Sequence, residues 1–231
     1  MGNLPPAAVL IDLEGTAIPG NFVTGVLRPF AVGHLLPFVA SSGHDAAVQV
    51  AIGEVLKAVP GQKPEDTLAH WLARELPVPP LQMLKALLWR SAMVDGTLDD
   101  PIFPDVGPTL RRWTGAGVRL AAYSADFAIL QRLIFAHARG GDLSGMFKGF
   151  FDTRLGMKGE PESFTRLAIA MAVPTFEVAY VSAIEDDLDA AATAGMRTCQ
   201  ILRNGGEATE RHPVATDFPG AADILGLPSV A

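Results

Sequence analysis

Short apolar runs alternate with helix-length segments over most of this 231-residue chain. The apolar runs span residues 7–13, 118–123, 178–182 and 197–202, with a shorter one at 149–152. Segments with a helical pattern lie between them, at residues 106–116, 126–138, 160–172 and 185–195. Neighbouring parallel strands are buried on both faces and need a crossover, usually a helix. The alternation therefore predicts an α/β fold with a doubly wound parallel sheet covered by helices.

Residues 21–98 interrupt this alternation. They are typical of four helices without a strand, separated by Gly-, Ser- and Pro-containing breaks at 41–43, 60–61 and 77–80. An insertion directly after the first strand predicts two parts, a Rossmann-like core of residues 1–20 and 99–231 and a helical cap of residues 21–98. The tail from residue 204 to 231 predicts a loop with one short helix.

Charge and cysteine content limit the partners and the compartment. The net charge of −7 disfavours a polyanion such as nucleic acid as partner. Cys199 is the single cysteine, which excludes an internal disulfide and fits a reducing cytoplasm. No run approaches the roughly 18 unbroken apolar residues of a membrane helix, and the residues before Asp12 lack the positive charge of a signal peptide. We therefore expect a cytoplasmic protein without a membrane or nucleic-acid partner, as a monomer or small homo-oligomer.

Polar residues stand at the ends of the predicted strands: Asp12, Ser124, Asp152 and Ser182. Because ligands of doubly wound sheets bind at the carboxyl ends of the strands, we expect these groups to converge on one rim. Asp12 is placed there to attack an electrophile and form a covalent intermediate. Glu14, two residues later, is placed to protonate a leaving group and then to activate water.

Two further residues favour an anionic substrate at this rim. Ser124 precedes a helix whose first N–H groups can hold an anion, and Lys158 supplies a positive charge. Taken alone, the motif D-x-E-G-T at 12–16 is explained equally well as a strand cap, because short motifs match by chance. The ordered set of Asp12, Ser124, Lys158 and the acidic cluster at 185–187 favours a catalytic centre.

This order of motifs resembles the haloacid dehalogenase-like superfamily. Glu14 at the third motif position and several longer segments are similar to the enolase-phosphatases, also called acireductone synthases, of methionine salvage. The similar segments are 10–19, 22–31, 102–106, 150–158, 188–191 and 194–196. The phrase F-D-T-x-x-G-x-K at 151–158 is specific to that family, and the resemblance is weakest in the cap.

The resemblance implies a Mg²⁺-dependent phosphatase coupled to an enolisation, acting on a small phosphate ester. The residues it implies are Asp12 as nucleophile and metal ligand, Glu14 as a carbonyl ligand, Asp187 as an acidic metal partner, Ser124 and Lys158 for phosphate, and Lys85 and Trp89 on the cap. Mg²⁺ and a lysine would neutralise a dianion that a carboxylate must otherwise attack against repulsion.

The expected metal motif is incomplete, because Ala183 stands where the family has an Asp. Losing a partner outside the direct ligands already lowers metal affinity by ~10–100-fold, so this loss should cost at least that. Asp187 lies one helical turn beyond Ala183 on the same face, with Glu185 and Asp186 nearby. Either one of the three reaches the metal through water, or they only place favourable charge in the first turn of a helix.

The phosphate loop and the cap also depart from the family. The loop reads Ser-Ala-Asp-Phe at 124–127 instead of Ser-Ser-Gly-Ser, so Asp126 is either a helix N-cap or a replacement metal ligand. The cap segment 84–98 keeps its scaffold positions but lacks the Gln-Gly and Gly-Tyr pairs, and Lys85 stands where a substrate-facing Gln is expected. Trp89 is better explained as a core residue than as a substrate contact. The alternatives to a phosphohydrolase are a metal-independent hydrolase of the same superfamily and a non-catalytic binding protein.

Overall fold

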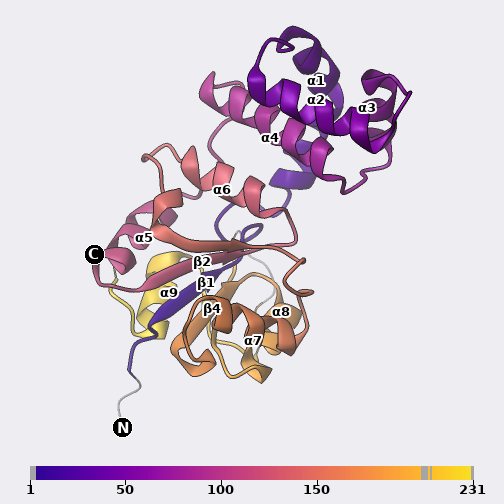
Figure 1. Cartoon of the computed structure of the whole chain (residues 1–231). Coiled ribbons are helices and arrows are strands. Elements are labelled where there is room, and N and C mark those ends of the chain that lie inside the picture. The colour runs from indigo at the N-terminus through magenta and orange to yellow at the C-terminus, as the bar shows by residue number, and fades with distance from the viewer. Residues whose placement is uncertain (1–3, 204–207, 209, 230–231) are drawn as a thin grey trace. The chain divides into compact units, whose positions relative to one another are not determined.

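The structure, a computed structural model, describes residues 4–203, 208 and 210–229. The chain divides into two compact units, one formed by Met1–Gly20 with Asp100–Ala231 and the other by Asn21–Asp99 (Figure 1). We call these the core unit and the helical unit.

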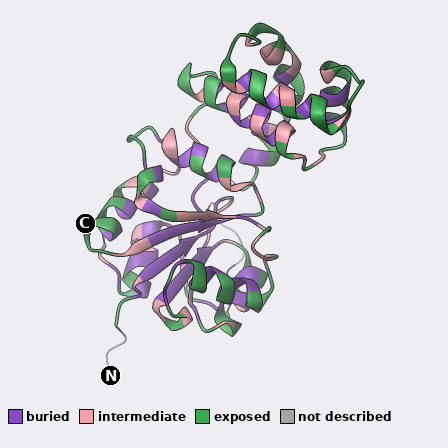
Figure 2. Ribbon diagram, in the orientation of Figure 1, coloured by how far each residue is buried: buried purple, intermediate pink, exposed green. Residues whose placement is uncertain are grey.

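The core unit is built on a parallel sheet. In the described part of the chain, six strands lie in the order β3-β2-β1-β4-β5-β6. The strands are β1 Ala8–Ile11, β2 Arg119–Tyr123, β3 Phe147–Phe151, β4 Val178–Ser182, β5 Arg197–Ile201 and β6 Val214–Ala215. All pair in parallel, and the central strands β1 and β4 are buried along their whole length (Figure 2). The predicted doubly wound α/β fold is confirmed.

Helices cover both faces of this sheet. The helices of the core unit are α5 Val106–Gly115, α6 Ala128–Ala136, α7 Pro161–Ala170, α8 Glu185–Thr193 and α9 Phe218–Leu225. Helices α7 and α8 share one hydrophobic cluster with the sheet residues Leu10, Tyr123 and Tyr180. On the opposite face α5 meets α9, where the rings of Trp113 and Phe218 stack with centroids 5.7 Å apart. In the tail, α9 is the one short helix that the sequence predicts, whereas the two-residue strand β6 is too short to leave a pattern.

The register of the sheet aligns the ends of its central strands. Ile11 of β1 pairs with Ala122 of β2 and with Val181 of β4. The residues that follow these pairs therefore emerge at the same edge of the sheet, since all three strands run in the same direction. This edge carries Asp12, Ser124 and Ser182.

The helical unit consists of helical segments, with no strand among its described residues. A π-helical turn, Val23–Leu27, leads into α1 Arg28–Ser41, followed by α2 Ala46–Ala58, α3 Pro64–Ala73 and α4 Pro79–Val94. Asp45 caps α2 by accepting hydrogen bonds from the backbone N–H groups of Ala47 and Val48. The Trp89 ring on α4 is buried and donates its Nε1–H to the Leu27 carbonyl at 3.0 Å.

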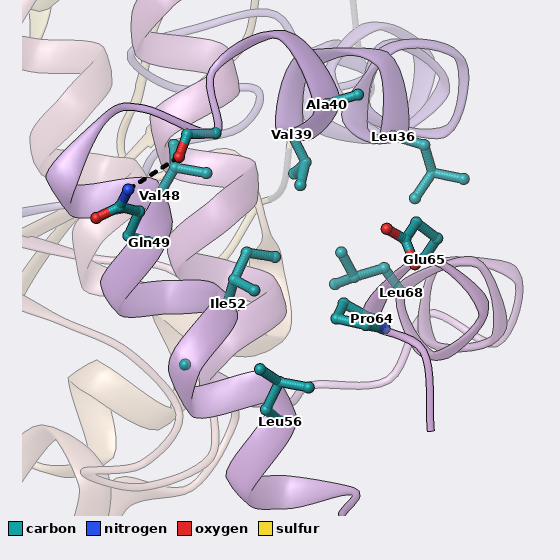
Figure 3. Close-up of a pocket in the computed structure, with 12 residues that line it drawn as sticks. Leu36, Val39, Ala40, Val48, Gln49, Ile52, Leu56, Pro64, Glu65 and Leu68 are labelled. Atoms are coloured by element: carbon teal, nitrogen blue, oxygen red, sulfur yellow. Dashed lines mark hydrogen bonds between the residues drawn. The ribbon is translucent and has the colours of Figure 1, made fainter. Parts of the chain in front are cut away.

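Two apolar features mark the helical unit. A cavity of about 360 Å³, lined by residues of α1, α2 and α3 such as Leu36, Ile52 and Leu68, lies within it (Figure 3). The continuous helical stretch Val23–Ser41 is long and apolar enough to be a candidate membrane span, with a mean hydropathy of 1.4. Charged and polar residues such as Arg28 and His34 interrupt this stretch, so it contains no long unbroken apolar run. One such helix is weak evidence, since core helices and signal sequences meet the same criterion.

Candidate active site

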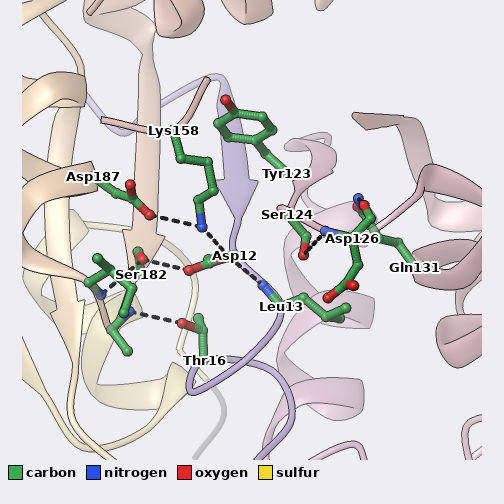
Figure 4. Close-up of polar contacts among 12 residues, drawn as sticks. Asp12, Leu13, Thr16, Tyr123, Ser124, Asp126, Gln131, Lys158, Ser182 and Asp187 are labelled. Carbon is green, nitrogen blue, oxygen red and sulfur yellow. Dashed lines mark hydrogen bonds and ion pairs between the residues drawn. The ribbon is translucent and has the colours of Figure 1, made fainter. Parts of the chain in front are cut away.

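The Asp12 carboxylate at the end of β1 is held from three directions (Figure 4). Its Oδ1 accepts hydrogen bonds from the Leu13 backbone N–H at 2.8 Å and from the Lys158 ammonium at 2.7 Å. Its Oδ2 accepts the hydroxyl proton of Ser182 at 2.7 Å. The residue is 3% exposed, so these contacts orient the carboxylate in a largely dry environment.

Lys158 joins two carboxylates. Its Nζ lies 2.7 Å from Asp12 Oδ1 and 2.8 Å from Asp187 Oδ2, which projects from the first turn of α8. Burial by itself would lower the pKa of Lys158, but the carboxylate of Asp12, together with Tyr180 and Asp187, raises that pKa above its ordinary value. Burial raises the pKa of Asp187 despite its ion pair with Lys158. The lysine is therefore a permanent cation at this centre.

One residue of the acidic cluster at 185–187 meets Lys158, and a neighbour in the cluster has a different partner. Glu185 forms an ion pair with Arg211, whose Nη2 lies 2.7 Å from Glu185 Oε1. Asp186 is exposed. Asp187 therefore contacts Lys158, and Glu185 links Arg211 to α8; whether one of the three acidic residues reaches a metal through water stays a prediction.

The turn after Asp12 brings residue 183 against the nucleophile. Gly15 has a φ of +74° and donates its N–H to the Ile18 carbonyl at 2.8 Å, a backbone conformation that L side chains rarely adopt. A Cβ added to Gly15 would lie 3.1 Å from the Cβ of Ala183. The Ala183 N–H in turn donates to Thr16 Oγ1 at 2.9 Å. The methyl group of Ala183 therefore faces the turn that carries the half-buried Glu14.

Ser124 lies on the other side of Asp12 from Asp187, at the end of β2 (Figure 4). Its Oγ accepts the Asp126 backbone N–H at 3.1 Å, and its own N–H donates to the Phe151 carbonyl at 3.2 Å. The buried Gln131 on α6 holds this loop, since its Nε2 donates to the carbonyls of Asp126 at 2.9 Å and Phe151 at 2.7 Å. Sequence reasoning missed Gln131, because a single polar residue in an apolar helix carries no local signal.

The interpretation of Asp126 as a helix N-cap is wrong. Helix α6 begins at Ala128 after Phe127, and no side chain of its N-cap residue caps it. The Ala128 N–H is bound instead by Asp152 Oδ2 at 3.1 Å, from the end of β3. Asp152 also accepts from the Arg154 side chain at 2.7 Å. The adjacent strand β3 supplies this cap, so local sequence could not reveal it.

Arg203 is a second residue that sequence reasoning missed. Its Nε donates to the Thr16 carbonyl at 3.2 Å, in the turn that follows Asp12. Its guanidinium pairs with both carboxylate oxygens of Asp105, at 2.8 and 3.0 Å. Arg203 also lies over the Phe103 ring, 4.3 Å from its centroid. This bidentate, largely buried ion pair holds the guanidinium of Arg203 in one geometry, and Arg203 in turn holds the Thr16 carbonyl in the turn.

The structure thus brings three of the predicted site residues into direct contact, Asp12, Lys158 and Asp187, with Glu14 and Ser124 on neighbouring backbone. The predicted substrate residues Lys85 and Trp89 belong to the helical unit. There the Lys85 ammonium lies 5.1 Å from the centroid of the Trp89 ring, and Trp89 is 2% exposed, which favours its interpretation as a core residue.

Comparison with known proteins places the chain in a family. No protein-family model matches it. It is 40% identical over 227 residues to the enolase-phosphatase E1 of Granulibacter bethesdensis, covering 97% of this chain and 98% of that protein. It is 39% identical over 228 residues to the enolase-phosphatase E1 of Acidiphilium cryptum, covering 98% of each. The chain belongs to the enolase-phosphatase E1 family. It is therefore a haloacid dehalogenase-like hydrolase of the phosphatase type, and this prediction is confirmed.

Solved structures support the fold of this family member. The UTR4 protein of Saccharomyces cerevisiae superposes with a TM-score of 0.79 at 23% identity, covering 92% of this chain and 98% of that one. A haloacid dehalogenase-like phosphatase of Thermococcus onnurineus superposes with a TM-score of 0.62 at 22% identity, covering 96% and 99%. At these identities the likeness is one of fold alone.

Enolase-phosphatases generally use Mg²⁺, but the donor set of this chain does not fit such an ion. Mg²⁺ prefers several oxygen ligands in near-octahedral geometry. Ala183 offers a methyl group where a carboxylate is expected, and both oxygens of Asp12 already accept hydrogen bonds. Among the residues that the structure describes, no three His, Cys, Asp or Glu side chains gather in a way that could hold a metal ion.

Proposed function

We propose that this chain hydrolyses a small phosphate ester through a covalent intermediate on Asp12. The proposed substrate is the diketo-methylthio-phosphopentane of methionine salvage or a relative of it, in line with the chain's family. The observation that carries the proposal is the Asp12 carboxylate at the end of β1, oriented by three hydrogen bonds, with the Lys158 ammonium 2.7 Å away.

The first step forms a bond between an Asp12 carboxylate oxygen and phosphorus. The bond from phosphorus to the ester oxygen breaks, and its electron pair leaves with that oxygen. Glu14, two residues after the nucleophile, is proposed to give its carboxylic proton to the leaving oxygen. The Leu13 N–H and the Ser182 hydroxyl hold the carboxylate in place, so little reorganisation accompanies the attack.

The second step releases inorganic phosphate. Water loses a proton to the Glu14 carboxylate and attacks phosphorus, and the bond between phosphorus and Asp12 breaks. This returns both carboxyl groups to their starting protonation states. Because the same residue acts as acid and then as base, replacing Glu14 should slow both steps.

Ser124 and Lys158 are proposed to hold the transferring phosphoryl group. The Ser124 hydroxyl accepts the Asp126 N–H, which leaves its own proton able to donate to a phosphoryl oxygen. The Lys158 ammonium lies 2.7 Å from Asp12 Oδ1, so its positive charge attracts both the nucleophile and the incoming phosphate anion. Neither residue needs to move far, since both are fixed by the core unit.

Phosphate release from a panel of phosphate monoesters, including the diketo-phosphopentane, tests the proposal. Asp12→Asn should abolish turnover while far-UV circular dichroism stays unchanged, because an amide is a poor nucleophile. The exposed Asp223 on α9 offers a matched control, so Asp223→Asn should keep wild-type rates. Activity near wild type in Asp12→Asn would move the chemistry to another residue. A wild-type protein that releases phosphate from none of these esters would favour the non-catalytic binding protein.

A further inference from the structure

We infer that this centre works without a bound divalent cation, and that Lys158 is the cation that meets the nucleophile and the phosphoryl group. The inference rests on the proposed function of Asp12. It departs from the metal use of the enolase-phosphatases, and three features of the centre carry it.

The first feature is the direction of residue 183. The Ala183 Cβ lies close to Gly15 in the turn that follows Asp12, because a Cβ built on Gly15 would lie 3.1 Å from it. An acidic side chain at 183 would start beside this turn, which directly follows the nucleophile. Alanine places a methyl group there, which cannot coordinate a hard cation.

The second feature is that the backbone around residue 183 is intact. The Ala183 N–H donates to Thr16 Oγ1 at 2.9 Å, and the Ile184 N–H donates to Ser182 Oγ at 3.1 Å. The loop therefore keeps a defined path from β4 into α8. Position 183 is therefore fixed by the backbone and lacks only a side chain that could bind a metal ion. A different path of this loop does not supply the missing ligand.

The third feature is that the remaining carboxylates have other partners. Asp12 Oδ2 accepts the Ser182 hydroxyl proton, and Asp12 Oδ1 binds Lys158. Asp187 Oδ2 binds the other side of the same ammonium at 2.8 Å. A metal ion at Asp12 or Asp187 would have to share these carboxylates with the Lys158 ammonium, which repels it, and among the described residues no group of three His, Cys, Asp or Glu side chains could hold such an ion.

The balance of charge determines how well such a metal-free centre should perform. Asp12 and Asp187 with Lys158 carry a net charge of −1 in a largely buried cluster. A bound metal would reverse this sign, whereas a lysine alone leaves a phosphate dianion facing an excess of negative charge. The centre should therefore bind phosphate weakly and turn over slowly, but without a need for added metal.

Three proteins test the inference: the wild type, Ala183→Asp and the control Ile184→Asp. Ile184 is the neighbouring residue and is 49% exposed, so Ile184→Asp adds the same charge at a position whose atoms are not among those near Gly15. Each protein is treated with a chelator and titrated with MgCl₂ by calorimetry. Phosphate release is then compared in chelator and in millimolar MgCl₂.

The wild type and Ile184→Asp should give no binding heat, and their activity should be the same in chelator as in MgCl₂. Ala183→Asp should bind Mg²⁺ with an affinity at least ~10–100-fold above that of the wild type. Its metal-free activity should fall below that of the wild type, because an uncompensated carboxylate faces Asp12, and MgCl₂ should restore it. This pattern would assign the missing ligand to position 183.

Saturable Mg²⁺ binding by the wild type, or loss of its activity in chelator, would overturn the inference. Absence of binding heat in Ala183→Asp, with the protein folded by circular dichroism, would overturn it too, since the position would not be the one that decides metal binding. Absence of phosphate release from the wild type under all conditions would refute the proposed function instead. The calorimetric comparison would still decide the metal question.

Discussion

The two sides of Asp12 are built from different kinds of interaction. On the α8 side, Lys158 lies between Asp12 and Asp187 in two ion pairs. On the α6 side, Ser124 and Gln131 are held by hydrogen bonds between neutral groups. Buried charges lose much when one partner is removed, whereas a neutral hydrogen bond contributes about 1 kcal/mol net. Substitutions on the α8 side should therefore lower both kcat/KM and stability strongly. Substitutions on the α6 side should lower kcat/KM less, by weakening the binding of the phosphate group.

Removing the charge of Lys158 should have the largest effect. Lys158→Met keeps the length of the stem but leaves Asp12 and Asp187 without their common cation. We expect kcat/KM to fall by ~100–1,000-fold, as for the loss of one donor to a developing negative charge, and stability to fall by about 3 kcal/mol. Steady-state kinetics and denaturant unfolding measure the two effects. An unchanged kcat/KM with an unchanged unfolding midpoint would contradict the central place of this ion pair.

Removing the hydroxyl of Ser124 should lower activity less than removing the Lys158 charge, and it should leave stability nearly unchanged. Ser124→Ala deletes one neutral donor to phosphate, so kcat/KM should fall by about tenfold, equivalent to ~1.4 kcal/mol. The unfolding midpoint should change little, because the substitution removes one part-buried hydrogen bond between neutral groups. Thr165→Ala, on the exposed part of α7, is the matched control and should leave both quantities unchanged. A decrease of kcat/KM in Ser124→Ala as large as that in Lys158→Met would contradict the proposed difference between the two sides of Asp12.

The hydrogen bond by which Asp152 caps α6 should make the free energy of unfolding depend on pH. Burial would raise the pKa of Asp152, but hydrogen bonds from the Arg154 side chain and from the N–H groups of Ala128 and Arg154 outweigh it, and that pKa lies below its ordinary value. A depressed folded-state pKa adds stability above the unfolded pKa of about 3.9. That stability disappears as the pH falls through the folded-state pKa.

Asp152→Asn should therefore cost about 1–2 kcal/mol near neutral pH. The difference from the wild type should shrink as the pH falls below the unfolded pKa. Denaturant unfolding at a series of pH values down to the acid limit of the protein measures both. A difference that stays constant from neutral pH to strongly acidic pH would show that the carboxylate charge does not stabilise α6.

Asp126 should matter least. Its backbone, not its carboxylate, provides the N–H to Ser124 and the carbonyl to Gln131. Asp126→Ala keeps both backbone groups, so it should change kcat/KM by no more than about twofold and stability by about 1 kcal/mol, the usual cost of a single substitution. The same variant titrated with MgCl₂ tests the alternative that Asp126 replaces the ligand missing at Ala183. A metal response that is present in the wild type and absent from Asp126→Ala would support that alternative.

Much of the core unit could be predicted from the chain's apolar pattern. Strand β4 was predicted with its observed bounds, Val178–Ser182, and the other long strands within a few residues. The breaks at 41–43, 60–61 and 77–80 separate helices in the structure as well. These features are local, since a buried strand or an amphipathic helix is visible within ten or so residues. The short strand β6 could not be predicted, because two residues show no periodicity.

Contacts between distant residues could not be predicted in the same way. The cap of α6 comes from Asp152, 24 residues from Ala128, and Arg203 reaches the Thr16 carbonyl from 187 residues away. Gln131 donates to the Phe151 carbonyl, 20 residues away. Each of these side chains acts through its tertiary neighbours, so its residue type alone could not distinguish it from other polar residues.

The sequence by itself determined the alternation of strands and helices, the order of Asp12, Ser124 and Lys158 along the sheet, and the absence of a carboxylate at Ala183. Only the tertiary structure decided that Asp187, and not Glu185, meets Lys158, and that Asp152 and not Asp126 caps α6. Hydrophobic periodicity is a property of a few neighbouring residues, whereas these pairings depend on strand register and on which face of α8 turns toward the sheet.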